Sequence, residues 1–173
     1  MIPTEDQIKV LWDKYELSEQ KRVHVKLVAR VAMYFASKIH VDKKLLFAAA
    51  LLHDIDKNIP KLPGERHPDT GVRILREEDM DEVADLVKTH PLHSILEPHI
   101  SPKTMEEKIL YLSDKMVKFD MVGVDGRFAL WRAENMPIEA VSILDKTYPK
   151  VKELEQEIFS IAHTTLEEIQ KLA

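Results

Sequence analysis

Apolar residues along this chain recur at spacings of three and four positions, which is the period of an α-helix with one buried face. The stretch that follows Ser18 shows the pattern most fully and predicts a helix to about Ile39, whose inner stripe is Val23, Leu27, Val28, Val31 and Phe35. The same pattern predicts helices over about residues 5–15, from Asp42 to beyond Asp54, and over 67–78, 81–89, 105–119, 127–134, 137–148 and 149–172. We therefore expect an all-α fold, a compact helical bundle formed by a single domain.

Residues that favour turns separate these helices. Pro60 and Gly64 predict a loop after the third helix, at a place where it can form the rim of a pocket. Residues 92–103 are expected to form a second loop, and Gly123 with Gly126 predicts a turn before the helix at 127.

Composition narrows the class of protein. The chain has 173 residues, of which 45% are hydrophobic and 32% charged, and this suits one soluble globular domain. The net charge of −5 does not suggest binding to nucleic acid, so no nucleic-acid partner is expected. The first residues lack the pattern of a signal peptide and no apolar run is long enough to span a membrane, which predicts a cytoplasmic protein without a membrane partner.

The third helix carries the residues with the clearest chemistry. Its apolar run from Leu45 to Leu52 ends abruptly in His53, Asp54, Asp56 and Lys57. Burying a charge at such a place is costly unless an opposite charge pairs with it, and a metal ion would supply that charge. The alternative is a helix end that becomes polar at the surface. Because the chain has no cysteine, a metal would be held by nitrogen and oxygen alone.

Other polar residues stand out against their apolar surroundings. His24 lies on the flank of the apolar stripe, where a lone histidine is more often a core residue with a hydrogen-bond partner than a metal ligand. His67 and His90 fall at opposite ends of two consecutive helices, so an antiparallel hairpin would bring them together; the alternative is two solvated histidines. Asp114 interrupts the apolar helix at 105–119 and is expected to be paired or bound to metal.

Taken together, these residues resemble the HD superfamily of metal-dependent phosphohydrolases, an all-α family with a single His, a His-Asp pair and a distant Asp on different helices. The resemblance covers about residues 20–120, with helices 127–172 expected to pack on that core. It implies that a first metal binds to His24, His53, Asp54 and Asp114. It also implies that His67 and His90 hold a second metal bridged by Asp54, with His93 as a rival ligand.

The resemblance also implies a reaction. Asp54 and Lys57 would be catalytic, with Lys57 facing a phosphate; Arg66 and Lys115 are weaker candidates for that task and fit solvated surface charges better. Imidazole and carboxylate ligands favour one or two ions of iron, manganese, cobalt, nickel or zinc. The chain looks most like the small stand-alone proteins that include symmetrical diadenosine-tetraphosphate hydrolases.

The predicted function is hydrolysis of a phosphoester or phosphoanhydride in a small nucleotide, for example a dinucleoside polyphosphate. Two alternatives remain open. One is a single-metal hydrolase of nucleoside monophosphates or cyclic nucleotides, and the other is a non-catalytic helical module that binds a nucleotide or a protein. The sequence leaves the oligomeric state open, with a homodimer among the options.

Overall fold

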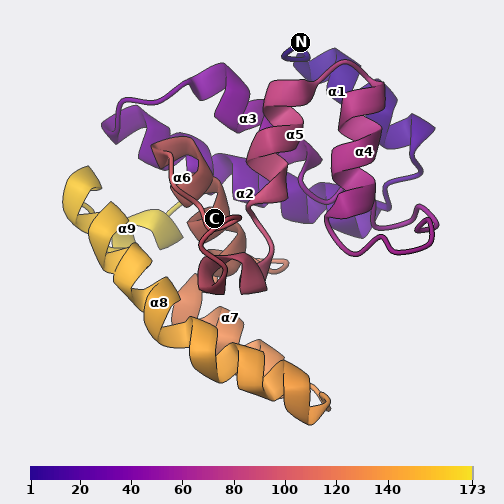
Figure 1. Ribbon diagram of the computed structural model, residues 1–173. Coiled ribbons are helices and arrows are strands. Elements are labelled where there is room, and N and C mark those ends of the chain that lie inside the picture. The colour runs from indigo at the N-terminus through magenta and orange to yellow at the C-terminus, as the bar shows by residue number, and fades with distance from the viewer. Residues whose placement is uncertain (173) are drawn as a thin grey trace.

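The computed structural model describes residues 1–172, and over that range the chain forms helices and no strand (Figure 1). In chain order the elements are α1 (Glu5–Lys14), α2 (Glu19–Lys38), α3 (Lys43–Leu52), α4 (Asp69–Glu77), α5 (Asp81–Lys88), the 3₁₀-helix η1 (Leu92–Leu96), α6 (Met105–Met116), α7 (Gly123–Arg132), α8 (Ile138–Ala162) and α9 (Leu166–Gln170). The all-α class expected from the sequence is confirmed.

The core lies around the paired helices α2 and α3, against which α5 and α6 pack (Figure 1). Helix α3 is apolar on nearly every side, and such a helix is stable only when it is enclosed. Leu46 and Leu52 of α3 are accordingly fully buried, in one cluster with Phe35 of α2 and Leu110 of α6. The residues that end α3 are therefore held in a well-packed setting.

Local capping chemistry sets where several helices begin. Thr4 and Thr104 each accept a hydrogen bond from the third residue of the helix they precede, and that residue's side chain accepts from the threonine N–H in return. Asp42 caps α3 by accepting from the N–H groups of Lys44 and Leu45, both at 3.0 Å. Its own N–H donates to Glu106 at 2.9 Å, so the start of α3 is tied to the start of α6.

The buried face of α2 contains His24 where the predicted stripe has Val23. Val23 is 46% exposed, whereas His24 beside it is 5% exposed. His24 therefore lies within the buried face, which continues through Val25 and Val28, and not on its flank.

Helix α3 ends earlier than predicted, at Leu52, so Asp54 and Lys57 do not lie on it. A series of tight turns follows, in which Ile55 N–H donates to the Leu52 carbonyl at 3.1 Å and Lys57 N–H to the Asp54 carbonyl at 3.2 Å. Lys57 still reaches Asp54 across three residues, but through these turns and not through a helix face.

The prediction of a turn at Gly123 and Gly126 was wrong, because both residues lie inside α7. Gly123 has a positive φ of 74°, and a Cβ added there would meet a Leu166 side-chain carbon at 3.0 Å. The glycine thus allows the positive φ at the first residue of α7 and leaves room for Leu166 beside it. The sequence pattern does not distinguish this role from a turn.

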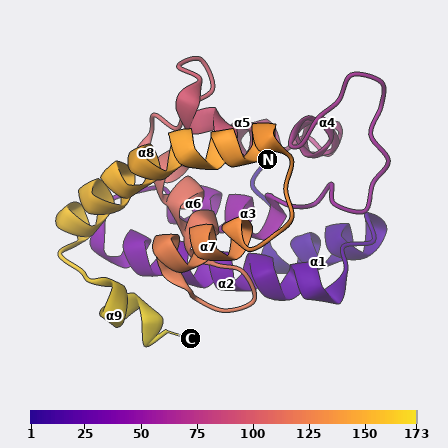
Figure 2. The same ribbon diagram turned by 90° about the horizontal axis from the view of Figure 1, so that it is seen from below.

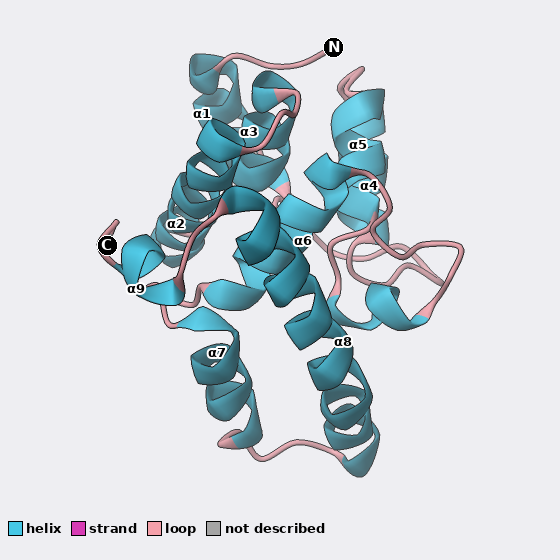
Figure 3. Cartoon of the chain, turned by 90° about the vertical axis from the view of Figure 1, so that its left-hand side faces the viewer, coloured by secondary structure: helices cyan, strands magenta, loops and turns pink. Residues whose placement is uncertain are grey.

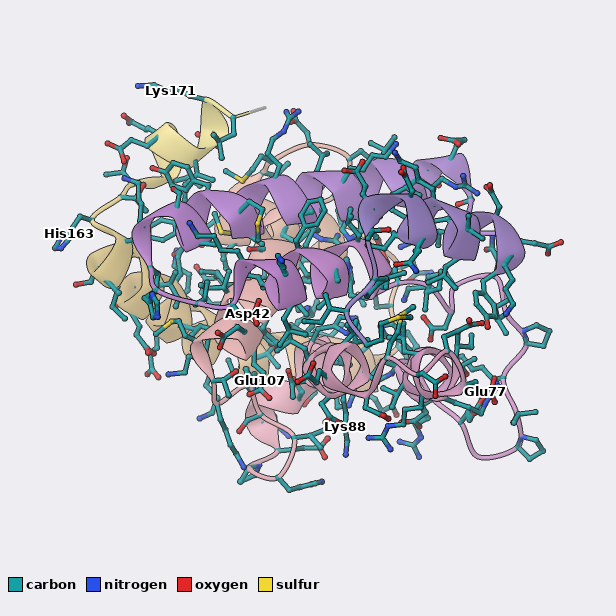
Figure 4. The ribbon with its side chains drawn as sticks, turned by 90° about the horizontal axis from the view of Figure 1, so that it is seen from above. Asp42, Glu77, Lys88, Glu107, His163 and Lys171 are labelled. Carbon is teal, nitrogen blue, oxygen red and sulfur yellow. The ribbon has the colours of Figure 1, made fainter. Side chains whose placement is uncertain are left out.

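The predicted break at Pro149 was also wrong, because α8 continues through it. Proline removes the N–H that would bond to the carbonyl of Asp145. Both residues are exposed, so water can satisfy that carbonyl and the interruption is tolerated. The helix ends instead at Ala162, and the next residue, His163, adopts a left-handed φ of 49° and points away from the body of the molecule (Figure 4).

The C-terminal helices cover one side of this core. Helix α8 crosses α6 and α7 (Figure 2) and also contacts η1, while α7 and the first half of α8 extend together from the body as an arm (Figure 3). Across residues 1–172, no helix combines the length and apolar character that crossing a membrane requires.

Candidate metal centre

Four of the predicted ligands meet at the junction of α2, the end of α3 and α6. His24 Nε2 lies 3.0 Å from Asp114 Oδ1, and His53 Nε2 lies 3.4 Å from the same oxygen. Asp54 Oδ2 faces both rings, at 4.0 Å from His24 Nε2 and 3.9 Å from His53 Nε2. These residues come from three separate elements, so the fold is what brings them together.

His67 and His90 form a second group beside the first. Helices α4 and α5 pack against each other, and the two Nε2 atoms lie 2.9 Å apart. Asp54 Oδ1 is 3.9 Å from His67 Nε2, so the two oxygens of Asp54 face the two groups. His93, the rival of His90, lies at the rim with 41% of its side chain exposed and is 3.8 Å from Glu97.

Each of these histidines is oriented through its Nδ1 atom. His24, His53 and His90 donate from Nδ1 to main-chain carbonyls, namely those of Lys118 at 2.8 Å, Ala50 at 2.8 Å and Val87 at 2.6 Å. A carbonyl only accepts, so Nδ1 carries a proton in each of these rings, and Nε2 is the nitrogen left to bind an ion. His67 Nδ1 lies 3.1 Å from the buried carboxylate of Asp56, which fixes that ring in the same way.

This arrangement fits a metal ion. The Nε2 atoms of the four histidines face one another and face carboxylate oxygens, so several donor atoms converge on the same small space. His53 Nε2 is fully buried and has no hydrogen-bond partner among the described residues. A cation would satisfy all of these atoms, and imidazole nitrogen with carboxylate oxygen is a donor set for transition metals. His24 with His53 and Asp114, and His53 with Asp54 and His90, are both spaced closely enough to share an ion.

Lysines surround the carboxylates. Lys21 Nζ lies 2.9 Å from Asp54 Oδ2, and Lys57 Nζ lies 3.4 Å from Asp54 Oδ1. Lys115 was expected to be a solvated surface charge, yet its side chain is 2% exposed and its Nζ lies 2.5 Å from Asp114 Oδ2. Arg66, by contrast, is exposed.

These charges set the protonation states. Burial favours the neutral acid, but His53 and Lys57 outweigh it and hold the pKa of Asp54 well below its usual range. Lys115 does the same for the pKa of Asp114, against a similar effect of burial. Burial and the neighbouring charge of His53 lower the pKa of His90, which keeps this ring neutral and able to donate a lone pair.

The two groups open into one cavity of about 360 Å³. Five of the six predicted ligands line it, all but the fully buried His53. The rest of the lining is Lys21, Lys57, Pro91, Leu92, His93, Lys115, Arg127 and Trp131. A larger hollow of about 590 Å³ lies over α4 and is lined by none of these residues, so size alone does not mark the site.

Some residues of the site were not predicted from the sequence. Lys21 lies three positions before His24, which places it on the same side of α2, and this spacing was a usable signal. Asp56, Arg127 and Trp131 offered none, since Asp56 looks like one more charge after His53 and the other two belong to a region without a recognisable motif.

Comparison with known proteins identifies relatives for most of the chain. A family model described as HD domain matches residues 23–118. The chain is 28% identical over 181 residues to a tRNA (cytidine(56)-2'-O)-methyltransferase of Picrophilus torridus, covering 98% of this chain and 50% of that protein. It is 34% identical over 139 residues to the methyltransferase of the same name in Thermoplasma volcanium, covering 70% of this chain and 40% of that protein.

A shorter match concerns a differently named enzyme. The chain is 35% identical over 81 residues to Ribonuclease Y of Aquifex aeolicus, which is 46% of this chain and 14% of that protein. No solved structure matches significantly. The chain spans about half the length, or less, of the curated relatives that it matches.

These matches correct two predictions. The assignment to a phosphohydrolase of small nucleotides was wrong, because the relatives that match most of the chain are named as tRNA methyltransferases. The expectation that nucleic acid plays no part was wrong for the same reason, since the names of these relatives specify an RNA. Net charge misled here because it averages over the whole surface, whereas lysines gather at the cavity.

Proposed function

This chain belongs to the HD domain family, and on that basis we propose that it is a metal-dependent hydrolase of phosphoester bonds in RNA. The observation that carries the proposal is the convergence of histidine Nε2 atoms and carboxylates on one cavity rimmed by lysines. The RNA part rests on the names of the relatives, which include two tRNA methyltransferases and a ribonuclease.

His24, His53, Asp54 and Asp114 would hold the first ion. His67 and His90 would hold a second, with Asp54 shared, because its two oxygens face the two groups. A divalent ion bound there supplies positive charge for phosphate oxygens and lowers the pKa of a bound water. The nitrogen and oxygen donors suit iron, manganese, cobalt, nickel or zinc.

The protein's own groups would position the RNA. Lys57 and Lys21 present ammonium groups at the cavity, where a phosphate oxygen of the substrate can compete with Asp54 for them. A cavity of about 360 Å³ is near the lower end of ligand sites, which run from about 300 to 1,000 Å³. It therefore suits one nucleotide of a strand, with the rest of the RNA outside.

The experiment is a cleavage assay on end-labelled RNA. The protein is incubated with a tRNA transcript and with an unstructured oligoribonucleotide, each with Mn²⁺, Co²⁺, Ni²⁺ or Zn²⁺ and with EDTA. We expect cleavage with at least one ion and none with EDTA. Asp54→Asn should lower the rate by ~100-fold or more, since replacing even a residue that supports a metal ligand costs about 10–100-fold.

A matched control is Asp85→Asn, which removes an exposed carboxylate of α5 whose ion-pair partner is Arg76. It should cleave at the natural rate. Cleavage that survives EDTA in the Asp54→Asn protein, or no cleavage of either RNA with any of the ions, would overturn the proposal.

A second candidate is tRNA methylation. The observation that favours it is the match of 98% of this chain to half of a tRNA methyltransferase. Its test is transfer of a radiolabelled methyl group from S-adenosylmethionine to a tRNA transcript. Incorporation that is abolished by placing a 2'-O-methyl group at cytidine 56 would support it, and no incorporation would leave hydrolysis as the function of this chain.

A further inference from the structure

The cations that line the metal cavity are not equivalent. Lys21 and Lys57 lie beside Asp54, and Lys115 lies beside Asp114, so each of the three has an acidic partner. Arg127 lines the same cavity, and within residues 1–172 it has no ion pair and no hydrogen bond from its guanidinium. Of the lysine and arginine side chains that line the cavity, it is the one without a carboxylate of the described residues within ion-pair distance.

The guanidinium of Arg127 is nevertheless held in place. Its central carbon lies 4.1 Å from the centre of the Trp131 ring, one turn further along α7, which is a close cation–π stack. Trp131 is itself packed edge-to-face on Phe128, with ring centres 5.2 Å apart. The arginine thus has a fixed orientation without using any of its hydrogen-bond donors.

Leaving those donors unused is costly. Nε and Nη1 of Arg127 are shielded from solvent and unpartnered, and buried donors without acceptors are rare in folded proteins. A ligand that brings acceptors to this wall of the cavity would meet the guanidinium at Nη2, the nitrogen that is neither shielded nor hydrogen-bonded among the described residues. The ligand must be anionic, because the wall offers an unpaired positive charge, and planar guanidinium donors match the oxygens of a phosphate.

We propose that Arg127, stacked on Trp131, is the phosphate anchor of this cavity and binds a backbone phosphate of an RNA strand. This rests on the proposed function for the identity of the strand. Arg127 would touch the substrate, whereas Trp131 would be a positioning residue that fixes the guanidinium. Because α7 lies outside the matched family region at 23–118, the anchor is supplied by the C-terminal helices of this chain.

The test measures binding without metal, so that it does not depend on turnover. A fluorescent hexauridylate and its uncharged methylphosphonate analogue are titrated with the protein in EDTA. Arg127→Gln should weaken binding of the charged strand by about 10- to 100-fold, the loss expected for a charge-assisted hydrogen bond, and Arg127→Lys by less. Neither variant should change binding of the uncharged analogue.

Arg132→Gln is the matched control, because Arg132 lies on the same helix but is exposed and pairs with Asp145 at 2.7 Å. It should bind the charged strand as the natural protein does. Circular dichroism establishes that the Arg127 variants remain folded. Equal affinity of Arg127→Gln and the natural protein for hexauridylate would overturn the proposal.

Trp131 provides an independent readout. Trp12, the other tryptophan, is buried and donates to the Leu51 carbonyl, so Trp12→Phe leaves Trp131 as the only tryptophan, which excitation at about 295 nm selects over tyrosine. In that background hexauridylate should change the emission, and the change should vanish with Arg127→Gln. An emission that hexauridylate leaves unchanged would count against the anchor. RNA cleavage that proceeds normally in an Arg127→Gln protein would refute the anchor and leave the proposed hydrolysis intact. If the natural protein binds hexauridylate through Arg127 but cleaves no RNA with any ion, the proposed hydrolysis is refuted and the anchor stands.

Discussion

Replacing Lys115 by methionine asks whether Asp114 serves as a metal ligand or only completes a buried ion pair. Lys115 Nζ lies 2.5 Å from Asp114 Oδ2 and donates to the His90 carbonyl at 2.7 Å. Methionine keeps most of the aliphatic volume, so the packing on α6 is largely preserved while the charge is lost. Without metal, Asp114 is then left beside His24 and His53 with no lysine to balance it.

The size of the effect follows from burial. Removing one partner of a buried ion pair costs roughly 3–5 kcal/mol, because the remaining charge is poorly solvated. For a chain of this length, 1 kcal/mol shifts Tm by about 2–4 °C. The metal-free variant should therefore melt about 6–20 °C below the natural protein. Since the side chain of Asp114 keeps 16% exposure to the cavity, we expect the lower half of that range.

A bound ion should reduce this loss. When the ion is present at about 100 times its Kd it stabilises the natural protein by ~2.7 kcal/mol. It should stabilise the variant more, because Asp114 no longer divides its charge between the ion and Lys115. A coupling of about 1–3 kcal/mol is typical of such linked effects. Tm is measured by circular dichroism in EDTA and in Mn²⁺.

Lys108→Met is the control on the same helix, where Lys108 pairs with Glu157 at 2.7 Å and both side chains are partly exposed. A surface pair contributes up to about 1 kcal/mol, so this variant should melt within a few degrees of the natural protein, with and without metal. If Lys115→Met lowers Tm equally in EDTA and in Mn²⁺, Asp114 does not bind the ion and the reasoning fails.

Three further predictions concern the second group of ligands. The double variant His67→Ala, His90→Ala should bind about half the metal found by elemental analysis and keep the first ion; unchanged stoichiometry would make the site mononuclear. Asp56→Ala should also lose the second ion, because His67 is no longer oriented by the Asp56 carboxylate, and its helical circular dichroism should be unchanged. Full metal content in this variant would show that Asp56 does not support the site. Burial lowers the pKa of His90 below its ordinary 6.5, so below that pH the unfolded chain takes up a proton that the folded chain does not. The free energy of unfolding should therefore fall as the pH drops below 6.5, by up to ~1.4 kcal/mol per pH unit. Urea titrations at several pH values should show a weaker dependence of this free energy on pH for His90→Phe.

Local sequence was a sufficient guide where a feature depends on neighbouring residues. The capping residues Thr4, Asp42 and Thr104 begin their helices where expected, because a cap needs only the next three positions. The approach of His67 to His90 was also foreseeable, since two short helices joined by a tight turn pack antiparallel. The second of these features accounts for His67 and His90, the second group of the candidate site.

Other features depend on contacts that a linear pattern does not contain. Gly123 suggested a turn, but its role is set by Leu166, which lies 43 positions later in the chain. Pro149 suggested a break, but its exposure allows the helix to continue. Lys115 suggested a surface charge, although α6 turns it inward onto Asp114. The net charge does not show that four cations, Lys21, Lys57, Lys115 and Arg127, gather at one cavity, because it averages over the whole chain.

The groups that orient the histidines affect how this site can change in evolution. His24, His53 and His90 are oriented by main-chain carbonyls, which remain whatever side chain occupies those positions. His67 depends on the side chain of Asp56, which one codon change can remove. On the proposed assignment, descendants of this chain can lose the second ion in a single step and regain it as easily. The first ion cannot be lost through such a supporting side chain, because main-chain carbonyls orient its histidines and only the replacement of one of its own ligands would remove it.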